Sequence, residues 1–329
     1  MNDPLVSIWM ITYNHEKYLS QALEGVLMQK TSFNYEIVIG EDCSTDGTRN
    51  VLESYVKKYS NLIKPLFHDK NVGAFRNAYE FVLPLCHGKY IACLEGDDFW
   101  TDPFKLQKQV DFLEKNPDYG LVHTELDHYY VKNDRYVRNH WAISGVKEQS
   151  GDLYNSLLGG GKSMILACTS CFRRELILDI DSEKYSKYMA GDVALWLHIS
   201  ARSKIGYINE STAVRNVLNY SATQGRDFNY RLKFIQSSLH VFNDYNSLRP
   251  FSKEAAYNFK QRYSSNICNL CYQFRERYDL FDENYKNLDD DYKTLNLRLE
   301  RFLFKYRIPK FVSRLILKIT NVLFPSKIY

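Results

Sequence analysis

The sequence has no long apolar run. None of its windows offers the roughly 18 uninterrupted apolar residues that a membrane-spanning helix needs. Its first residues, MNDPLVSIWMITYN, have no basic segment before the apolar stretch and no A-x-A-like cleavage site, so they predict a first strand rather than a signal peptide. We therefore expect a cytoplasmic protein.

Cysteine is scarce, and its count is odd. The seven cysteines are Cys43, Cys86, Cys93, Cys168, Cys171, Cys268 and Cys271. An odd, scattered set without export signals predicts free thiols. Two pairs have C-x-x-C spacing, Cys168 with Cys171 and Cys268 with Cys271, so a zinc site is an alternative interpretation. Because these pairs lie far apart in the sequence and lack flanking glycines, buried thiols are the favoured interpretation.

Acidic residues are absent from the end of the chain. Residues 301–329 hold seven Lys or Arg and no acid, whereas the preceding residues hold 36 basic and 39 acidic side chains. An apolar stripe there comprises Val312, Leu315, Ile316, Ile319, Val322 and Leu323. With Lys310, Arg314 and Lys318 opposite, it is typical of a helix in peripheral contact with the inner face of a membrane. A helix packed on the protein is the alternative, and nucleic acid is disfavoured because basic and aromatic residues interleave only over 301–307.

Strand and helix patterns alternate over the first hundred residues. Strands are expected at 5–12, 35–41, 63–68 and 90–94, with helices at 19–27, 51–59 and 75–83. This alternation predicts parallel βαβ units with right-handed crossovers. Residues 119–215 read as mixed strands and short helices, and the Tyr-rich segment 229–300 reads as helical.

Two acidic turns follow predicted strands. Glu41 and Asp42 end one strand, and Glu95, Asp97 and Asp98 end another. Ligands of open parallel sheets bind at the carboxyl ends of the strands. Carboxylate oxygens there suit Mg²⁺ or Mn²⁺, which commonly bring substrate phosphates with them. The alternative, a plain polar turn, usually holds for a lone Asp-Asp pair, but the second acidic turn favours a ligand site.

Four segments carry a resemblance to a known family. VSIWMITYN, YEIVIGEDCSTDGT, NVGAFRNA and GKYIACLEGDDFWTDPFKLQKQVDFLEKNPD occur in the order and spacing typical of family 2 glycosyltransferases, over about residues 4–225. The resemblance implies the α/β fold of GT-A type, with a Rossmann-like, mostly parallel central sheet flanked by helices. It also implies an inverting transfer of a sugar from a nucleotide diphosphate, most often UDP, with Mn²⁺ or Mg²⁺ as cofactor.

The same resemblance implies roles for single residues. Nucleotide contacts are implied for Thr12, Tyr13, Asn14, Glu41, Asp42, Arg76, Asn77 and Asp97. Asp98 would bind the metal, and Asp192 in MAGDVALW would be the general base, although it could also be only a helix N-cap. Glu95, where the family more often has Asp, and Arg215 are further candidates. No His follows Arg215, as one often does in the family. Asp46 would shape its turn and cap the helix that follows.

One further motif resembles a nucleotide-binding element. Residues 159–163, GGGKS, are similar to the end of a phosphate-binding loop, but a helix-like segment precedes them and a strand-like one follows, which is the wrong order. A loop on the acceptor side is therefore expected. The sequence has neither a G-x-S-x-G elbow nor an H-E-x-x-H pair, so His123 and His128 are interpreted as packing or surface residues.

Together these features predict a transferase with two parts. Residues 1–228 would form the catalytic domain, with a nucleotide-binding part over 1–100 and an acceptor part over 101–228; residues 229–329 would form a helical region with the basic tail. We expect this transferase to move a sugar from a UDP-sugar or other nucleotide-sugar to a hydroxyl of a glycan or lipid-linked acceptor in surface polysaccharide synthesis.

Other functions remain open. A nucleotidyltransferase would need a Gly-rich, basic N-terminal loop that this sequence lacks. A non-catalytic module that binds a nucleotide-sugar or a membrane would keep the fold without turnover. The helical region could pair two chains in a homodimer, and no nucleic-acid partner is expected.

Overall fold

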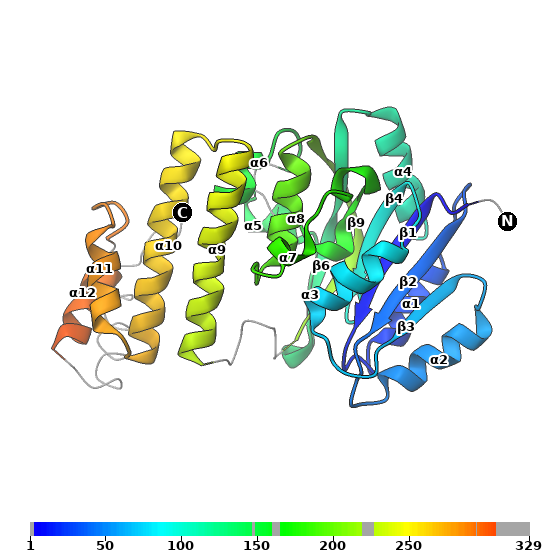
Figure 1. Ribbon diagram of the computed structural model, residues 1–329, viewed down its shortest axis with the longest axis horizontal. Coiled ribbons are helices and arrows are strands. Elements are labelled where there is room, and N and C mark those ends of the chain that lie inside the picture. Colours follow the sequence, from blue (N-terminus) through cyan, green and yellow to red (C-terminus); the bar gives the residue numbers. More distant parts are fainter. Residues whose placement is uncertain (1–2, 147–148, 160–164, 219–226, 294, 307–329) are drawn as a thin grey trace. The chain divides into compact units, whose positions relative to one another are not determined.

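The computed structural model describes residues 3–146, 149–159, 165–218, 227–293 and 295–306. These residues form two compact units. The first comprises the described residues of 1–221 together with 244–250, and the second those of 222–243 together with 251–329 (Figure 1). The segments 160–164 and 307–329 lie outside the described residues, and so do most of the GGGKS motif and the apolar stripe of the tail.

Four parallel strands form the first half of the central sheet. They lie in the order β3-β2-β1-β4 and are β1 (Val6–Thr12), β2 (Tyr35–Glu41), β3 (Ile63–Phe67) and β4 (Tyr90–Glu95) (Figure 1). All four strands were predicted within one residue at each end. The regular apolar runs of these segments are local signals, which is why the sequence indicates them well.

The second half of the sheet mixes strand directions. β8 (Cys171–Arg173) lies antiparallel between β4 and β6 (Tyr119–Tyr130), and β9 (Lys204–Val217) runs parallel to β6. β5 (Phe99–Trp100) pairs antiparallel with β9, and β7 (Arg135–Val137) pairs antiparallel with β6. The α/β architecture is thus confirmed, and the β5–β9 pair brings the turn after β4 beside the end of β9.

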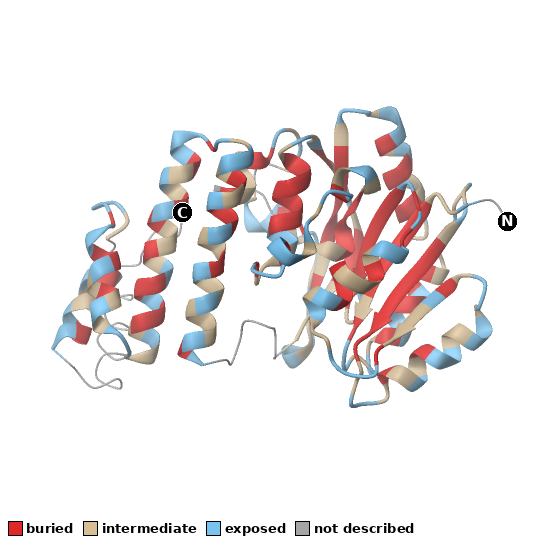
Figure 2. Cartoon of the chain, in the orientation of Figure 1, coloured by how far each residue is buried: buried red, intermediate tan, exposed pale blue. Residues whose placement is uncertain are grey.

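Side chains of β1 alternate between two covered faces. Ile8 and Met10 belong to the main apolar core with residues of α1, whereas the ring of Trp9 packs against Tyr79 on the opposite face. Figure 2 shows the strands of this sheet as the most continuously buried part of the unit.

The helical elements of the unit are α1 (Leu19–Leu27), α2 (Thr48–Lys58), α3 (Ala74–Arg76), the π-helical turn η1 (Asn77–Val82), η2 (Leu83–Leu85), α4 (Lys105–Lys115), η3 (Val131–Asn133), α5 (His140–Ser144), α6 (Tyr154–Gly159), η4 (Ala167–Thr169), η5 (Arg174–Ile177), α7 (Ser182–Tyr185) and α8 (Gly191–Ser200).

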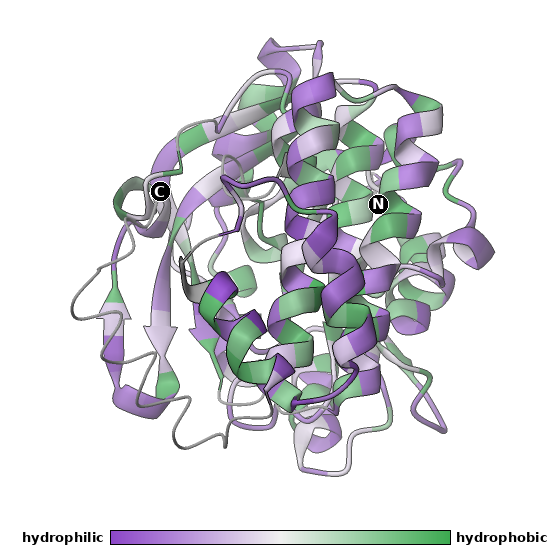
Figure 3. Cartoon of the chain, turned by 90° about the vertical axis from the view of Figure 1, so that its left-hand side faces the viewer, coloured by the Kyte–Doolittle hydropathy of each residue, from purple (hydrophilic) through white to green (hydrophobic). Residues whose placement is uncertain are grey.

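The second unit is helical, as the sequence predicted. Its elements are α9 (Phe228–Leu248, whose last turn belongs to the first unit), α10 (Lys253–Phe274), α11 (Tyr278–Lys286) and α12 (Leu295–Lys305). A core of its own includes Leu270, Phe281 and Phe304, and the two cysteines of the second C-x-x-C pair are buried in it. Figure 3 shows hydrophobic and hydrophilic residues on different sides of these helices, the pattern of amphipathic helices around a core. In the described part of the chain, no helix has both the length and the apolar character to cross a membrane.

A lysine is buried in the first unit. Lys105, at the start of α4, is 0% exposed; its ammonium lies 4.6 Å from the centroid of the Trp100 ring and donates to Gln109 Oε1 at 2.5 Å. Burial lowers the pKa of Lys105 to about 8. Between pH 8 and pH 10 the unfolded chain therefore binds more protons at this residue than the folded one, so Lys105 makes the free energy of unfolding rise with pH.

Replacing Lys105 by Met should remove this dependence. We expect the stability of the parent relative to K105M to rise by about 2 kcal/mol from pH 8 to pH 10, as measured by urea unfolding at each pH. The comparison between variants cancels the buried thiols and phenols, which titrate in the same range. K115M, which changes an exposed lysine of the same helix, is the control. If the difference in free energy of unfolding between the parent and K105M is the same at pH 8 and pH 10, the pKa of Lys105 is not lowered.

Candidate functional site

The carboxyl ends of β1, β2 and β4 meet at one edge of the sheet. The register pairs Thr12 with Glu41 and Ile11 with Glu95, so the two acidic turns follow neighbouring strand ends on either side of β1. This is the edge at which open parallel sheets bind ligands.

The turn after β1 is tied to the turn after β2. Asn14 adopts a left-handed backbone conformation, with φ of 56°. Its side-chain oxygen accepts from the Thr45 N–H at 2.8 Å, and its own N–H donates to Ser44 Oγ at 3.0 Å. Thr12 is 1% exposed, whereas Tyr13 is 40% exposed. Of the predicted TYN contacts, Tyr13 and Asn14 are therefore exposed whereas Thr12 is buried, and Asn14 also organises the loop.

Glu41 and Asp42 are engaged within the protein. Glu41 is fully buried; it accepts from the Ser44 N–H at 2.6 Å and pairs with Arg49 at 2.7 Å. Burial alone would raise the pKa of Glu41, but the bonds from Ser44 and Arg49 outweigh it and leave that pKa below its ordinary value. The Asp42 carboxylate accepts from the N–H groups of Val72 and Gly73 at 2.7 and 2.9 Å. Both acids thus hold the loops around this edge.

Asp46 shapes the turn that leads into α2, as expected from the sequence. Its carboxylate accepts from the Thr48 N–H at 3.0 Å and from the Glu16 N–H at 3.2 Å. Gly47 rather than Asp46 is the N-cap residue of the helix, so the predicted cap lies one residue later than expected. Asp46 therefore fixes the start of α2 and the turn after β1 at the same time.

Arg76 and Asn77 have different surroundings. Arg76 is exposed and pairs with Glu80 at 2.7 Å. Asn77 is 1% exposed; its amide donates to the Gly40 carbonyl at 2.9 Å, and its side-chain oxygen lies 3.0 Å from His68 Nε2. The side chain of Asn77 is thus occupied beneath the strand end, whereas that of Arg76 reaches solvent.

Four carboxylates and one guanidinium gather past the end of β4. Burial, together with the charges of Asp97, Asp98 and Asp192, raises the pKa of Glu95 to about 8, against the opposing effect of the Arg215 charge. Glu95 and Asp192 are nevertheless exposed to water. The fold therefore assembles residues that are more than 100 positions apart in the sequence.

Asp98 is the most enclosed of the four. It is 5% exposed, and its Oδ1 accepts from the Asn216 N–H at 2.9 Å. Burial and the neighbouring Asp97 raise its pKa to about 7, against the effect of the bond from Asn216. Asn216 also donates from its side chain to the Asp97 carbonyl at 2.5 Å. Nothing in the sequence around Asn216 indicated this role.

Asp192 lies in the first turn of α8. Ala190 is the N-cap residue, so the interpretation of Asp192 as the N-cap is wrong. The Asp192 Oδ1 accepts from the adjacent Val193 N–H at 2.8 Å, and desolvation by the surrounding protein raises the pKa of Asp192. A carboxylate at this end of a helix interacts favourably with the helix dipole. Asp192 is thus a water-accessible carboxylate on a fixed element.

Two histidines near these residues were not predicted as site residues. His15 Nε2 lies 3.9 Å from Asp97 Oδ1, and His15 Nδ1 lies 3.3 Å from Thr12 Oγ1. Although no His follows Arg215 in the sequence, β6 places His128 beside it in register. The His128 ring stacks on His140 with centroids 3.8 Å apart, and burial lowers its pKa to about 3. His128 is therefore a neutral packing residue, as the sequence suggested.

The acidic residues suit a hard cation in part. Oxygen ligands of this kind bind Mg²⁺ or Mn²⁺. Burial is the main cause of the raised pKa values of Glu95 and Asp98, and the smaller contribution from neighbouring carboxylates is negative charge that a cation would neutralise. Across the described ranges, no three His, Cys, Asp or Glu side chains converge as a complete metal site. This arrangement is consistent with the common mode in which one or two carboxylates bind the ion together with substrate phosphates.

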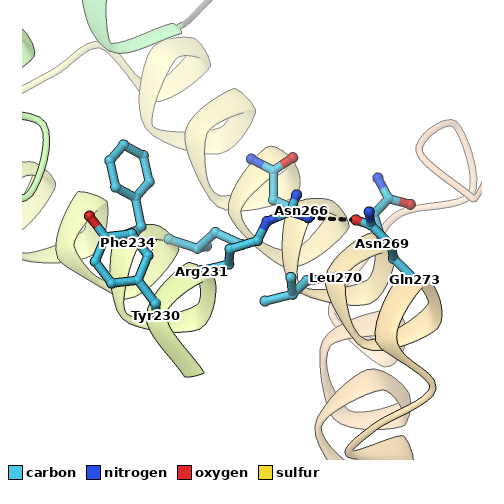
Figure 4. A pocket seen from close by; sticks show the side chains of 8 residues that line it. Tyr230, Arg231, Phe234, Asn266, Asn269, Leu270 and Gln273 are labelled. Carbon is cyan, nitrogen blue, oxygen red and sulfur yellow. Dashed lines mark hydrogen bonds between the residues drawn. The ribbon is translucent and has the colours of Figure 1, made fainter. Parts of the chain in front are cut away.

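A separate cavity of about 350 Å³ lies between α9 and α10 (Figure 4). Arg231 crosses it and donates to Gln273 Oε1 at 2.8 Å. The lining residues are Tyr230, Arg231, Phe234, Ile235, Asn266, Asn269, Leu270 and Gln273. None of the predicted site residues lines this cavity, so it is not the predicted site.

Comparison with known proteins places this site in context. Residues 7–180 match the family described as Glycosyl transferase family 2, which is more than half of the chain. WfaP of Escherichia coli, a UDP-Glc:alpha-D-GlcNAc-diphosphoundecaprenol beta-1,3-glucosyltransferase, is 30% identical over 202 residues, covering 60% of this chain and 71% of that protein. Other curated relatives are more identical over shorter stretches, and the matches span about a third to a half of their length.

Solved structures share the fold. Residues 1–349 of Staphylococcus aureus TarS in complex with UDP-GlcNAc superpose with a TM-score of 0.55 at 16% identity, covering 92% of this chain and 91% of that one. The mannosyltransferase PcManGT of Pyrobaculum calidifontis, in complex with GDP-Man and Mn²⁺, gives a TM-score of 0.54 at 14% identity, covering 98% and 88%. The predicted GT-A type of fold is thereby confirmed.

Proposed function

Because the chain belongs to glycosyl transferase family 2, we propose that it transfers a sugar from a UDP-sugar, with inversion, to a hydroxyl of a glycan or lipid-linked acceptor. The observation that carries the proposal is the gathering of Glu95, Asp97, Asp98 and Asp192 around Arg215 at the strand ends. Two similar proteins support the donor class: WfaP is named for UDP-Glc, and TarS was solved with UDP-GlcNAc.

In the proposed reaction, the acceptor oxygen attacks the anomeric carbon while the bond from that carbon to the diphosphate oxygen breaks. Asp192 takes the proton of the acceptor hydroxyl, and its raised pKa brings its basicity closer to what neutral pH requires. Arg215 stabilises the negative charge that develops on the departing UDP. Mn²⁺ or Mg²⁺, held by Asp98, would supply further charge neutralisation there.

The nucleotide contacts divide into two groups under this proposal. Tyr13, Arg76 and Asp97 have accessible side chains and contact the nucleotide directly. The other set, whose side chains are engaged in hydrogen bonds within the protein, holds the loops that form the pocket. That set comprises Thr12, Asn14, Glu41, Asp42 and Asn77.

The test is release of nucleotide from a panel of UDP-sugars and GDP-mannose with Mn²⁺ and a mixed glycan and lipid-linked acceptor pool. We expect UDP release that depends on acceptor and stops with EDTA. Pyrophosphate release from NTP would instead indicate a nucleotidyltransferase. Thermal stabilisation by UDP and Mn²⁺ without turnover of any donor would indicate a binding module and defeat the proposal.

Association with the inner face of the cell membrane, through residues 301–329, remains a proposal and rests on the sequence pattern of the tail. Co-sedimentation with anionic liposomes should weaken as salt is added and on deleting residues 301–329. Equal sedimentation of the full and truncated chains would remove this proposal and leave the transferase proposal unaffected.

A further inference from the structure

A π-helical turn lies between the nucleotide edge and the candidate base. Residues 75–83 read as an ordinary helix in the sequence, but Asn77–Val82 forms the π-helical turn η1 between α3 and η2. Such turns are rare and occur frequently at functional sites, because the extra residue changes the direction in which side chains point. In this turn Asn77 contacts β2 and Tyr79 contacts α8.

Tyr79 makes a specific contact with the start of α8. Its hydroxyl donates to the Gly191 carbonyl at 3.2 Å, directly before Asp192. Tyr79 is 9% exposed, and its ring lies 4.8 Å from Phe75 and 5.1 Å from Trp9, centroid to centroid. A buried ring held on several sides gives its hydroxyl a fixed position. The first turn of α8 is therefore bonded to a residue from the nucleotide-binding part of the chain.

The other end of the same segment is bonded to the turn after β2. The Asp42 carboxylate accepts from the Val72 and Gly73 N–H groups, immediately before α3. The Asn77 amide then donates to the Gly40 carbonyl at 2.9 Å. Residues 72–79 thus connect the predicted nucleotide turn to the backbone of Asp192 through hydrogen bonds at both ends.

We propose that Tyr79 is a positioning residue for the transfer reaction: through the Gly191 carbonyl it fixes the backbone of the base Asp192 relative to the nucleotide turn at Asp42. This inference rests on the proposed function, since it needs Asp192 to act as the base. It adds a role for segment 72–79: when a nucleotide binds at the turn of Asp42, the hydrogen bonds of this segment also restrict the motion of the first turn of α8. Tyr79 touches neither substrate nor metal in this scheme.

The first test is Y79F, which removes the hydroxyl and keeps the ring. We expect kcat for sugar transfer to fall about 3- to 10-fold, the effect of one lost hydrogen bond, while the KM for the donor and the Kd for UDP change less than about twofold. Y188F is the matched control: it removes the hydroxyl of another buried tyrosine, which donates to Asp244 Oδ2 at 2.5 Å rather than to the Gly191 carbonyl. We expect Y188F to have a melting temperature similar to that of Y79F and the same kcat as the parent.

A double-mutant cycle separates positioning from a general packing effect. D192E keeps a carboxylate but displaces it by one methylene, so in that background Y79F should lower kcat by less than about twofold. The same cost of Y79F in both backgrounds would overturn the inference. If D192N retains full activity, Asp192 is not the base and the inference fails while sugar transfer stands. If the parent turns over no donor, the proposed function fails instead, so the two failures are distinguishable.

A second measurement needs no acceptor. In the parent, UDP with Mn²⁺ should slow hydrogen exchange at amides 72–82 and at 191–195; in Y79F the slowing should persist at 72–82 and disappear at 191–195. Y188F should behave like the parent. Equal protection of 191–195 in Y79F and the parent would show that the contact does not fix the base, and would overturn the inference.

Discussion

Replacing Asp192 by Asn should lower kcat for sugar transfer by about 10² to 10⁴, which is the usual contribution of a positioned general base. Asn has nearly the shape of Asp and retains an oxygen that can accept from the Val193 N–H, so α8 should begin as it does in the parent. The loss would therefore report the missing proton acceptor. Steady-state kinetics with saturating donor and acceptor measure this effect.

The pH dependence gives a second readout for the same variant. Burial raises the pKa of Asp192, and a protonated carboxyl cannot accept a proton, so kcat of the parent should fall as the pH is lowered through that pKa. D192N should lack this limb and bind UDP as the parent does. D111N, at an exposed acid of α4, is the control for loss of a charge. Normal turnover by D192N would exclude Asp192 as the base.

Replacing Asp98 by Asn should reduce Mn²⁺-assisted binding of UDP by at least about 100-fold, because an amide is a much weaker ligand for a hard cation than a carboxylate. Asn can still accept from the Asn216 N–H, so the contact between the β4 turn and β9 is retained. Isothermal calorimetry of UDP binding with Mn²⁺, and again with EDTA, measures the effect.

D97N is the matched variant for this experiment. Asp97 is adjacent, has a side chain that is 24% exposed, and is proposed to contact the nucleotide. We expect D97N to weaken UDP binding with and without Mn²⁺ alike, whereas D98N should remove only the part that depends on the metal. If D97N instead removes only the metal-dependent part of UDP binding, the two roles are exchanged. If the parent binds UDP equally well with Mn²⁺ and with EDTA, the metal has no part in the proposed function.

The elements that the sequence predicted well are those with strong local patterns. The strands at Val6–Thr12, Tyr35–Glu41 and Tyr90–Glu95 follow from short apolar runs, and helices in 229–300 follow from their periodicity. The π-helical turn at Asn77–Val82 was not foreseen, because its residues also fit an ordinary helix. Its geometry depends on contacts with β2 and α8, which no local pattern records.

For the site, residue type proved easier to predict than residue environment. The sequence could place carboxylates at the strand ends, but it could not tell that Glu41 is closed off by Arg49 while Glu95 stays accessible. Asn216 and His15 gave no signal at all, since their relevance comes only from what lies beside them in space.

The sequence by itself determined the kind of sheet, the edge at which its acids collect and the family whose motifs it carries. Only the tertiary structure decided which carboxylates are occupied by internal partners and which face the open site. The reason is distance along the chain: Asp98 meets Asn216 across 118 residues and Tyr79 meets Gly191 across 112. Contacts of this range depend on how the whole sheet and its crossovers pack, whereas strand patterns depend only on near neighbours.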